Sequence, residues 1–251
     1  MTPAAFKRSI RDLQVWCSSC MVAFSGADPI GVLIGAKRPS GTLIHTIAVH
    51  PGHRRQGHGR HLLTSLSSKL AILGPPRMAA EVPEAFDATR ALFSACGYAQ
   101  EAVLTDYVLS EPVGAPGGNS GFVIPVTLDD LAANGLLEEA DPQVCWERSV
   151  ETLTARKDDI TGFAVASDER IEACLLYANL EAGTEILALR SFAEDGGARL
   201  AQLLAQLRGR APGIVRFPKV HPAEMSDEFL KALGLHPAGG HHLYAAKARS
   251  A

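Results

Sequence analysis

The stretch over residues 41–73, GTLIHTIAVHPGHRRQGHGRHLLTSLSSKLAIL, constrains the fold more than any other part of the sequence. Residues 43–50 are apolar or β-branched apart from two histidines and lie between a glycine and a proline, which predicts a mostly buried strand. From residue 60 onward, leucines recur at helical spacing until Gly74 and two prolines end the pattern. The sequence therefore predicts a strand, a glycine-containing turn and an amphipathic helix in direct succession.

The turn over residues 54–59 is predicted to lie at the N-terminus of that helix, where unpaired N–H groups and the helix dipole favour an anion. Gly57 and Gly59 let the backbone bend sharply and approach a phosphate, and nearby arginines add positive charge. A Walker loop would need Lys and Ser/Thr where the chain has His58 and Gly59, and a dinucleotide fingerprint would need a small residue at Leu62. The pattern thus indicates a diphosphate cradle of a third kind.

The run Ala48-Val49-His50-Pro51, followed by Arg54-x-x-Gly57-x-Gly59-Arg60 and by Leu62-Leu63, resembles the acetyl-CoA-binding motif of the GCN5-related N-acetyltransferases (GNAT). The resemblance implies that acetyl-CoA is the cosubstrate. It also implies that main-chain groups of Ile47, Ala48 and Val49 hold the pantetheine arm as a pseudo-strand. The diphosphate would then bind the turn, at Arg54, Arg55, Gln56, Gly57, His58, Gly59 and Arg60.

Two residues are candidates for the catalytic base. An alkyl amine with a pKa near that of lysine, about 10.4, must lose a proton before it can attack at neutral pH. His45 lies on the predicted central strand, which is similar to the strand of arylalkylamine N-acetyltransferases where a histidine takes part in proton removal. A hydrogen-bonded histidine without catalytic duty fits the same sequence equally well. Glu81, on the next predicted strand, is the second candidate.

One position departs from the family's pattern. The usual acid is a tyrosine on the helix predicted over residues 87–96, where this sequence has Phe93. Phenylalanine cannot donate a proton to the departing thiolate, although coenzyme A thiolate is a tolerable leaving group, with a pKa near that of cysteine, about 8.5, so that water can serve. Phe93 therefore motivates an alternative function, that of a non-catalytic acyl-CoA-binding or regulatory module.

The order of predicted elements is similar to the acetyltransferase fold from its second helix onward, which implies an α/β fold with a mixed central sheet flanked by helices. A short helix is predicted over residues 3–15, then strands over 20–25, 30–36, 43–50, 78–82 and 102–109. The family's opening strand and helix have no counterpart in this sequence.

The segment PVGAPGGNSG, residues 112–121, reads as a linker, and the same organisation recurs after it. Gly183-Thr184 followed by an apolar run echoes Gly41-Thr42, and a second leucine stripe follows at residues 200–207. We therefore predict an internal repeat, with an acetyl-CoA-binding domain over residues 1–111 and a second GNAT-like domain over residues 122–251. The second copy has Glu194 and Asp195 where the first has arginines, and carboxylates repel a diphosphate. It is therefore interpreted as a degenerate copy.

Composition excludes several other classes of function. The net charge of -3 gives no reason to expect nucleic acid, and no apolar run approaches the length of a membrane span. Five cysteines, an odd number without a signal-peptide core, favour a reducing cytoplasm. The histidines near the turn match no metal-ligand spacing, so we expect no metal. Trp16-Cys17-Ser18-Ser19-Cys20 runs into a predicted strand, which disfavours a redox site because that motif needs a helix N-terminus.

The sequence is therefore interpreted as an acetyl-CoA-dependent N-acetyltransferase whose N-terminal half is active. The acceptor would be a small-molecule or peptide amine, and a homodimer is compatible with the repeat. Nothing in the sequence identifies the acceptor further.

Overall fold

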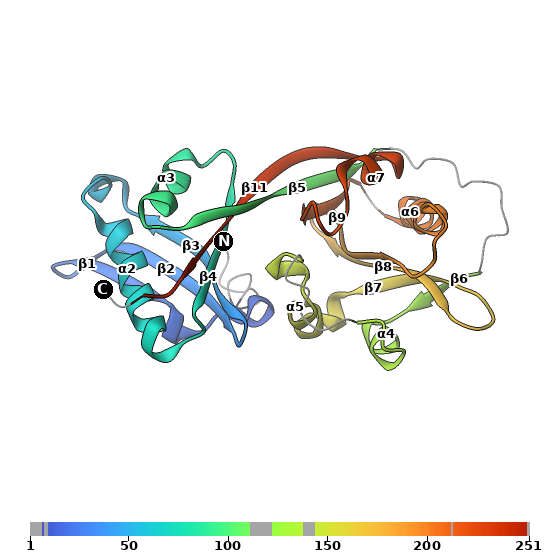
Figure 1. Ribbon diagram of the computed structural model, residues 1–251, viewed down its shortest axis with the longest axis horizontal. Helices are drawn as coiled ribbons and strands as arrows, with labels where there is room; N and C mark the ends of the chain where they lie inside the picture. The colour runs from blue at the N-terminus through green and yellow to red at the C-terminus, as the bar shows by residue number, and fades with distance from the viewer. Residues whose placement is uncertain (1–6, 8–9, 111–121, 138–143, 212, 250–251) are drawn as a thin grey trace. The chain divides into compact units, whose positions relative to one another are not determined.

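The computed structural model describes residues 7, 10–110, 122–137, 144–211 and 213–249. It forms two compact units (Figure 1). Unit 1 comprises residues 1–103 and 240–251, and unit 2 comprises residues 104–239. The predicted linker over residues 112–121 lies outside the described residues, as do residues 3–6 and 8–9 of the helix predicted over residues 3–15, whereas residues 10–13 are helical.

Unit 1 contains a mixed sheet in the order β1-β2-β3-β4-β11. Strands β1, β2 and β3 pair antiparallel, β3 and β4 pair parallel, and β11 pairs antiparallel with β4. The elements are η1 (Cys17–Ser19), β1 (Met21–Ser25), β2 (Asp28–Arg38), β3 (Gly41–Val49), η2 (Pro51–His53), α2 (His58–Leu73), β4 (Arg77–Pro83) and α3 (Asp87–Ala95). The predicted hairpin, central strand and basic turn before a helix are thereby confirmed.

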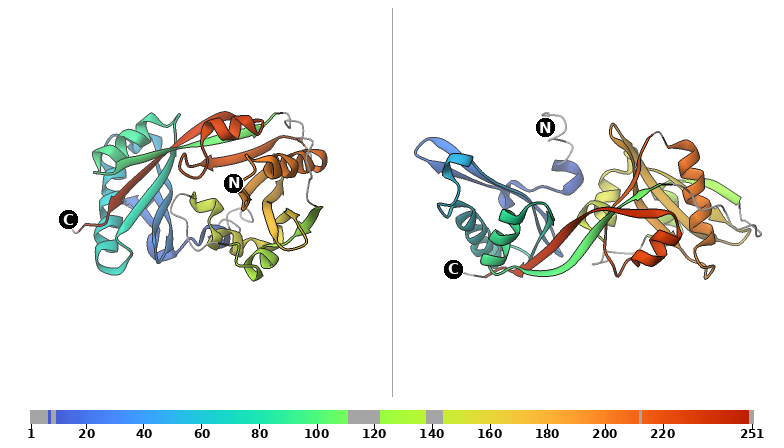
Figure 2. Two further views of the ribbon diagram at one scale, coloured as in Figure 1. Left: turned by 45° about the vertical axis from the view of Figure 1, so that its right-hand side comes forward. Right: turned by 90° about the horizontal axis from the view of Figure 1, so that it is seen from above.

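The core of unit 1 lies between its sheet and helices α2 and α3. The leucine stripe of α2 buries Leu62, Leu63, Leu66 and Leu70 against Leu33, Ile44 and the alternate residues Met78, Ala80 and Val82 of β4. Helix α3 adds Phe93 to the same core. Both helices lie over one face of the sheet in all the views of the ribbon (Figures 1 and 2). We call the other face of this sheet, which neither α2 nor α3 covers, the face opposite the helices.

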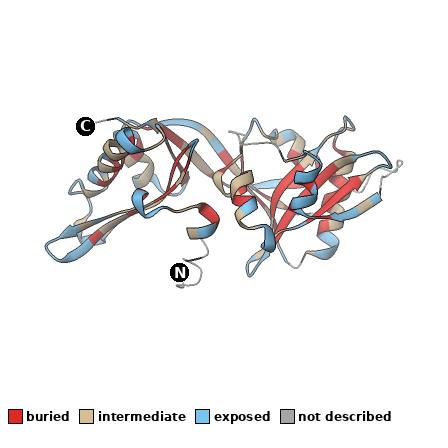
Figure 3. Ribbon diagram, turned by 90° about the horizontal axis from the view of Figure 1, so that it is seen from below, coloured by how far each residue is buried: buried red, intermediate tan, exposed pale blue. Residues whose placement is uncertain are grey.

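Unit 2 repeats this plan with a sheet in the order β5-β10-β9-β8-β7-β6. Its leucine-rich helix α6 packs Leu200, Leu203, Leu204 and Leu207 into a core that includes Leu175 and Phe217, and buried residues line its strands (Figure 3). The elements are β6 (Phe122–Val126), α4 (Leu128–Ala133), η3 (Trp146–Arg148), α5 (Val150–Ala155), η4 (Lys157–Asp159), β7 (Thr161–Ala166), β8 (Ile171–Leu180), β9 (Gly183–Ser191), α6 (Ala198–Arg210), β10 (Val215–Val220) and α7 (Asp227–Ala232).

Two strands carry the chain between the units. Strand β5 (Ala99–Leu109) pairs with β10 of unit 2 over residues 105–109, and β11 (Leu235–Lys247) pairs with β4 of unit 1 over residues 241–247. The compact units therefore do not coincide with the predicted division at residues 112–121, which remains a prediction about the two copies in the sequence. Strands β10 and β11 could not be predicted from the sequence, because Pro218 and a run of Pro, Gly and His residues hide their strand pattern.

No helix in the part of the chain that the structure describes is long and apolar enough to cross a membrane.

The dependence of unit 1 on β11 gives a testable expectation. Tyr244 is 5% exposed, opposes Ala80 of β4 and stacks on Phe93 with ring centroids 5.9 Å apart. Tyr244→Ala should destabilise unit 1 by about 3–5 kcal/mol, the usual cost of truncating a buried aromatic side chain. Hydrogen exchange by mass spectrometry should show faster exchange in β4 and unchanged exchange in β8, with exposed Lys247→Ala as the control. Unchanged exchange in β4 would contradict this role of β11.

Candidate functional site

The central feature of unit 1 is the point where β3 and β4 separate. In the described residues the two parallel strands pair only at Thr42 with Met78 and at Leu43 with Ala79. Strand β3 nevertheless continues to Val49 and stays paired with β2 along its whole length. The edge of β3 that faces β4 therefore leaves its backbone groups beyond Leu43 outside that ladder. An extended ligand can bind such an edge as an added strand.

A β-bulge lies at this opening. Ile34 of β2 opposes Thr46, and Gly35 opposes Ile44, so His45 is the extra residue of β3. Bulges re-aim side chains and are frequent beside active sites. Ile44 and Ile47 pack against the α2 and α3 core, which leaves His45 and Thr46 on the opposite face.

Glu81 occupies the matching position on the neighbouring strand. Its neighbours Ala80 and Val82 are buried under α3, so alternation along β4 places Glu81 on the face opposite the helices. His45 and Glu81 each lie two residues beyond the last β3–β4 pair, Leu43 with Ala79. Both side chains are half-buried. The structure thus brings the two predicted catalytic candidates to the two sides of one opening.

The turn after β3 is held by its own side chains. Arg54 donates from Nε to the carbonyl oxygen of Val49 at 3.0 Å, and Gln56 donates from its amide nitrogen to the carbonyl of Gly52 at 3.3 Å. The ring nitrogen Nδ1 of His50 accepts from the Gly52 N–H at 3.3 Å. These bonds fold the turn back on the end of β3, so the turn leads directly from the opened strand to α2.

Helix α2 begins without a side-chain cap. Gly57 is its N-cap residue, with φ 89° in the left-handed region, and within the described residues no side chain caps this end. His61 is the first residue whose N–H bonds back into the helix, to the carbonyl of Gly57. The preceding N–H groups and the positive end of the helix dipole are therefore available to an anion, with Arg54, Arg55 and Arg60 close in sequence.

The two glycines of the turn are required for different physical reasons. A Cβ at Gly57 would meet nothing within 4 Å, so its left-handed backbone is what requires glycine. A Cβ at Gly59 would lie 3.0 Å from Cδ2 of Leu92, so Gly59 permits close packing of α2 against α3. The left-handed conformation of the turn thus requires Gly57, whereas Gly59 lets the first turn of α2 pack closely against Leu92 of α3.

Phe93 lies inside the core and not at a surface. It is 1% exposed, with its ring centroid 5.0 Å from that of Tyr98 in an edge contact and 5.9 Å from that of Tyr244 in a stacked contact. Tyr98 donates its hydroxyl to the sulfur of Met78 at 3.6 Å, and burial raises the pKa of Tyr98 well above its usual value. A tyrosine whose neutral form is favoured in this way is a poor proton donor.

Unit 2 contains the same local architecture without the titratable pair. Within the described residues, strands β9 and β10 pair in parallel at only two positions, the last being Glu185 with Arg216. A bulge in β9 falls at Leu187, because Leu176 opposes Ala188 and Tyr177 opposes Ile186. Two residues beyond the last β9–β10 pair stand Leu187 and Pro218, in place of His45 and Glu81. These two side chains cannot exchange protons.

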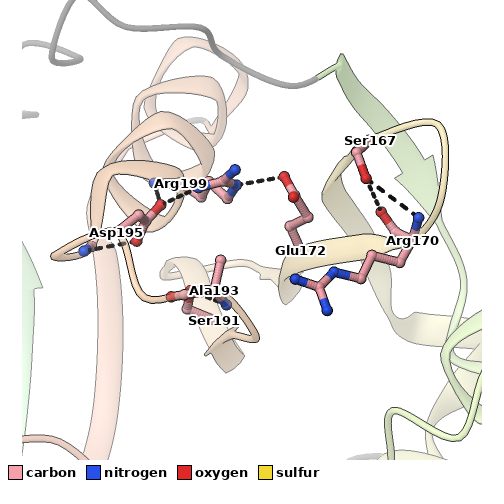
Figure 4. A network of polar contacts seen from close by, with 8 residues as sticks. Ser167, Arg170, Glu172, Ser191, Ala193, Asp195 and Arg199 are labelled. Atoms are coloured by element: carbon pink, nitrogen blue, oxygen red, sulfur yellow. Dashed lines mark hydrogen bonds and ion pairs between the residues drawn. The ribbon is translucent and has the colours of Figure 1, made fainter.

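The helix N-terminus of the second copy is closed by its own carboxylate (Figure 4). Helix α6 also begins at a left-handed glycine, Gly197, with φ 90°. Asp195 accepts from the N–H of Gly197 at 3.0 Å and from the N–H of Arg199 at 2.9 Å. The Arg199 side chain bridges Asp195 and Glu172 at 2.9 and 2.6 Å. The donors that a diphosphate would need are therefore taken by Asp195.

The pKa of Asp195 reflects this arrangement. Burial alone raises it, but the hydrogen bonds from the Arg199 side chain and from the backbone N–H groups of Arg199 and Gly197 outweigh burial and lower the pKa. The two helix ends differ in their fit to an anionic group: in the part of the chain that the structure describes, the α2 end has no side-chain cap, whereas Asp195 accepts from the N–H groups of Gly197 and Arg199 at the α6 end. The residues present in unit 1 thus suit a diphosphate, and those in unit 2 do not.

The remaining candidates from the sequence are the cysteines considered for a redox site and the histidines considered for a metal site. Cys17 and Cys20 flank a short 3₁₀ turn before β1, and all five cysteines of the chain are free thiols. The rings of His50, His53 and His58 contact one another edge to face, with centroids 5.7 and 6.2 Å apart. Within the described residues no group of three or more His, Cys, Asp or Glu side chains is placed to hold a metal ion.

An opened strand pair with a bulge, followed by a basic turn into an uncapped helix, defines a site for an extended ligand with an anionic end. Comparison with family models agrees with this description. Residues 3–98 match the model of the "Acetyltransferase (GNAT) family". The family match therefore covers the part of the chain that forms most of unit 1.

Several solved structures share a similar fold over nearly the whole chain. A GCN5-related N-acetyltransferase from Sphaerobacter thermophilus is 15% identical, with a TM-score of 0.66, and the match covers 92% of this chain and 81% of that one. A tandem GNAT protein from the clavulanic acid biosynthesis pathway is 17% identical, with a TM-score of 0.65 and coverage of 97% and 88%.

A third structure is a GCN5-related glucosamine N-acetyltransferase region of a fungal multi-domain β-N-acetylglucosaminidase. It is 13% identical, with a TM-score of 0.71 and coverage of 95% of this chain and 34% of that one. A comparison with curated proteins found no match. The fold is therefore that of the GNAT proteins, including a tandem one, in both units.

Gly57 provides the first test of the site. Gly57→Ala forces a Cβ into a left-handed conformation, which should cost about 1–2 kcal/mol of stability or shift the turn. Calorimetric binding of coenzyme A should weaken as the turn shifts. Gly209→Ala in α6, where no atom lies within 4 Å of the added Cβ and φ is ordinary, should instead stabilise the protein by about 0.5–1 kcal/mol. Unchanged stability and coenzyme A affinity in Gly57→Ala would contradict this account of the turn.

Asp195 provides the second test. Asp195→Ala should lower the free energy of unfolding by about 1 kcal/mol at pH 7, the usual value of a helix cap. Because the folded-state pKa lies below the unfolded value of about 3.9, this stabilisation is complete above that value and is lost as the pH falls through the folded pKa. In urea unfolding of both proteins, the difference in stability should therefore be constant from pH 7 down to about pH 5 and shrink as the pH falls below about 3.9. Asp168→Ala, at an exposed turn of unit 2, is the control. A difference that does not shrink at low pH would argue against the cap.

Proposed function

We propose that unit 1 transfers an acetyl group from acetyl-CoA to a primary amine by direct attack of the amine on the thioester. The observation that carries the proposal is the opened edge of β3, which leads within one turn to the uncapped N-terminus of α2. The main-chain groups of Ile47, Ala48 and Val49 would bind the pantetheine arm along this edge. The N–H groups over residues 55–60 would bind the diphosphate, with Arg54 held in place by its bond to Val49.

His45 and Glu81 are assigned to the handling of the amine. An ammonium group approaching the opening from the face opposite the helices meets the Glu81 carboxylate and the His45 imidazole. Imidazole titrates near pH 6.5, so its neutral form can accept the amine proton at pH 7. A backbone N–H at the bulged end of β3 would stabilise the developing negative charge on the thioester oxygen. Acetyl-CoA supplies the activated acyl group.

The proposal is tested by turnover of two variants. His45→Gln and Glu81→Gln should each lower the rate of thiol release at pH 7, by about 10²–10⁴-fold for the residue that acts as base. Coenzyme A affinity measured by calorimetry should stay unchanged, because these side chains do not hold the diphosphate. The variant that lacks the base should regain rate as the pH rises toward the pKa of the amine, about 10.4. His236→Gln, an exposed histidine of unit 2, is the matched control.

A full rate in both variants at pH 6 to 7 would remove these residues from the mechanism while leaving acetyl transfer in place.

A second function is motivated by Phe93. Because Phe93 is fully packed in the core, position 93 supplies no proton to a departing thiolate. Unit 1 would then be a non-catalytic acyl-CoA-binding or regulatory module. Calorimetric binding of acetyl-CoA without thiol release for any amine of a broad panel would favour this module over the enzyme.

A further inference from the structure

The face that carries His45 and Glu81 also carries a row of uncharged side chains. Val22 of β1 opposes Val32 of β2, and Val32 opposes Ala48 of β3, so these residues form one line across three strands. Ile34, two residues from Val32, opposes Thr46 beside the bulge. Phe24 lies two residues beyond Val22 on the edge strand. We call Val22, Phe24, Val32, Ile34 and Ala48 the apolar strip.

Alternation along each strand places the strip opposite the helices. Met21 and Ala23 of β1, Leu33 of β2 and Ile47 of β3 all pack into the core under α2 and α3. Their neighbours in sequence therefore stand on the other face. Because His45 and Glu81 share that face, the strip starts at the bulge and runs from β3 toward the edge of the sheet.

The strip is accessible at its outer end. Val22 is 52% exposed and Phe24 is 60% exposed, and Val32 and Ile34 are half-buried. Scattered exposed apolar residues are ordinary on protein surfaces, but these are contiguous and end at a titratable pair. A contiguous exposed apolar surface bordered by polar groups can mark a ligand-binding surface.

Charge is distributed unevenly over this face. None of the five strip residues is charged, and Arg38, the charged residue of β2 that alternation places on the same face, lies at the end of the strand. Arg38 opposes Gly41, at the far end of β3 from Ala48. A ligand lying on the strip with its nitrogen at the opening therefore meets a carboxylate at one end and hydrocarbon along its length.

From this juxtaposition we propose that the acceptor is a primary amine carried on an apolar body, with the ammonium at His45 and Glu81 and the hydrocarbon on the apolar strip. The inference rests on the proposed function and names its substrate class. Val22 and Val32 are then specificity-determining residues. Ile34 opposes Thr46 beside the bulge, whereas Val32 and then Val22 lie farther from the opening, so only the longer alkyl chains reach Val32 and Val22.

The apolar strip predicts how the affinity for an alkylamine changes with the length of its chain. Each methylene group buried from water contributes about 0.8 kcal/mol, which corresponds to an approximately fourfold change in a dissociation constant. Affinity should therefore rise by about threefold to fourfold per methylene along a series of linear alkylamines, until the chain passes the edge of the sheet. A second ammonium at the far end of the chain loses this gain, because it would have to lie on hydrocarbon.

The test measures butylamine, hexylamine, octylamine and 1,6-diaminohexane against the full-length protein saturated with coenzyme A. Dissociation constants come from calorimetry or ligand-observed NMR, and KM and kcat come from thiol release with acetyl-CoA. We expect progressively tighter binding from butylamine to octylamine, and hexylamine to bind at least tenfold more tightly than the diamine. The preference should appear in KM more than in kcat, since the strip binds ground state and transition state alike.

Variants of nearly the same shape test whether the strip causes the gain in affinity per methylene group. Val22→Thr and Val32→Thr keep the shape and the β-branched side chain but add a hydroxyl, so they should at least halve the gain per methylene. Ile72→Thr, at an α2 side chain that is 78% exposed, should leave the series unchanged. A thermal unfolding curve for each variant identifies any that is misfolded.

The outcomes separate this inference from the proposed function. Affinity independent of chain length, tighter binding of the diamine, or equal effects of Val32→Thr and Ile72→Thr would overturn the apolar acceptor while acetyl transfer to another amine still stood. Graded alkylamine binding without thiol release would support the strip and reject the enzyme. Binding of none of the four amines to the coenzyme A complex would reject the apolar acceptor.

Discussion

The structure of unit 1 depends on the loss of pairing between β3 and β4. A parallel pair that ends after Leu43 and Ala79 leaves backbone donors and acceptors of β3 without a strand partner, which is costly unless water or a ligand binds them. The bulge at His45 and the turn that brings Arg54 back to Val49 both lie on the strand that has lost its neighbour. The proposed cofactor site, the proposed base and the proposed acceptor surface therefore all depend on one local separation of strands.

In unit 2, strands β9 and β10 separate in the same way, but a side chain and not an anion from solution caps the helix that follows. The strands part at the equivalent pair and the bulge falls on Leu187, so the backbone plan has survived. The anion that unit 1 would take from solution is replaced in unit 2 by Asp195, which an arginine holds in position. Replacing a bound anion by a tethered carboxylate keeps the helix end capped at all times, which stabilises α6 and removes its binding capacity.

The local elements of unit 1 could be predicted from the sequence because each has a short-range cause. Glycine and proline bound β3, the leucine stripe defines α2, and Gly57 marks the turn between them. Two features could not be predicted. The bulge at His45 depends on register with β2, and the pairing of β11 with β4 joins residues more than 150 positions apart. The helix that carries Phe93 could be predicted, but the burial of Phe93 and its contact with Tyr244 required the tertiary structure.

The pairing of β11 with β4 gives a physical reason to keep the C-terminal half of the chain, which we interpret as a degenerate copy. Strand β4 carries Glu81 on one face and core residues on the other, and residues 241–247 of the chain cover its second edge. Without that strand, β4 would be the edge of a sheet at the position where a candidate catalytic residue must be held still. Unit 1 therefore depends on the end of the chain for the rigidity of its own site. Selection on acetyl transfer in unit 1 would then preserve the fold of unit 2, because the chain must pass through unit 2 before β11 returns.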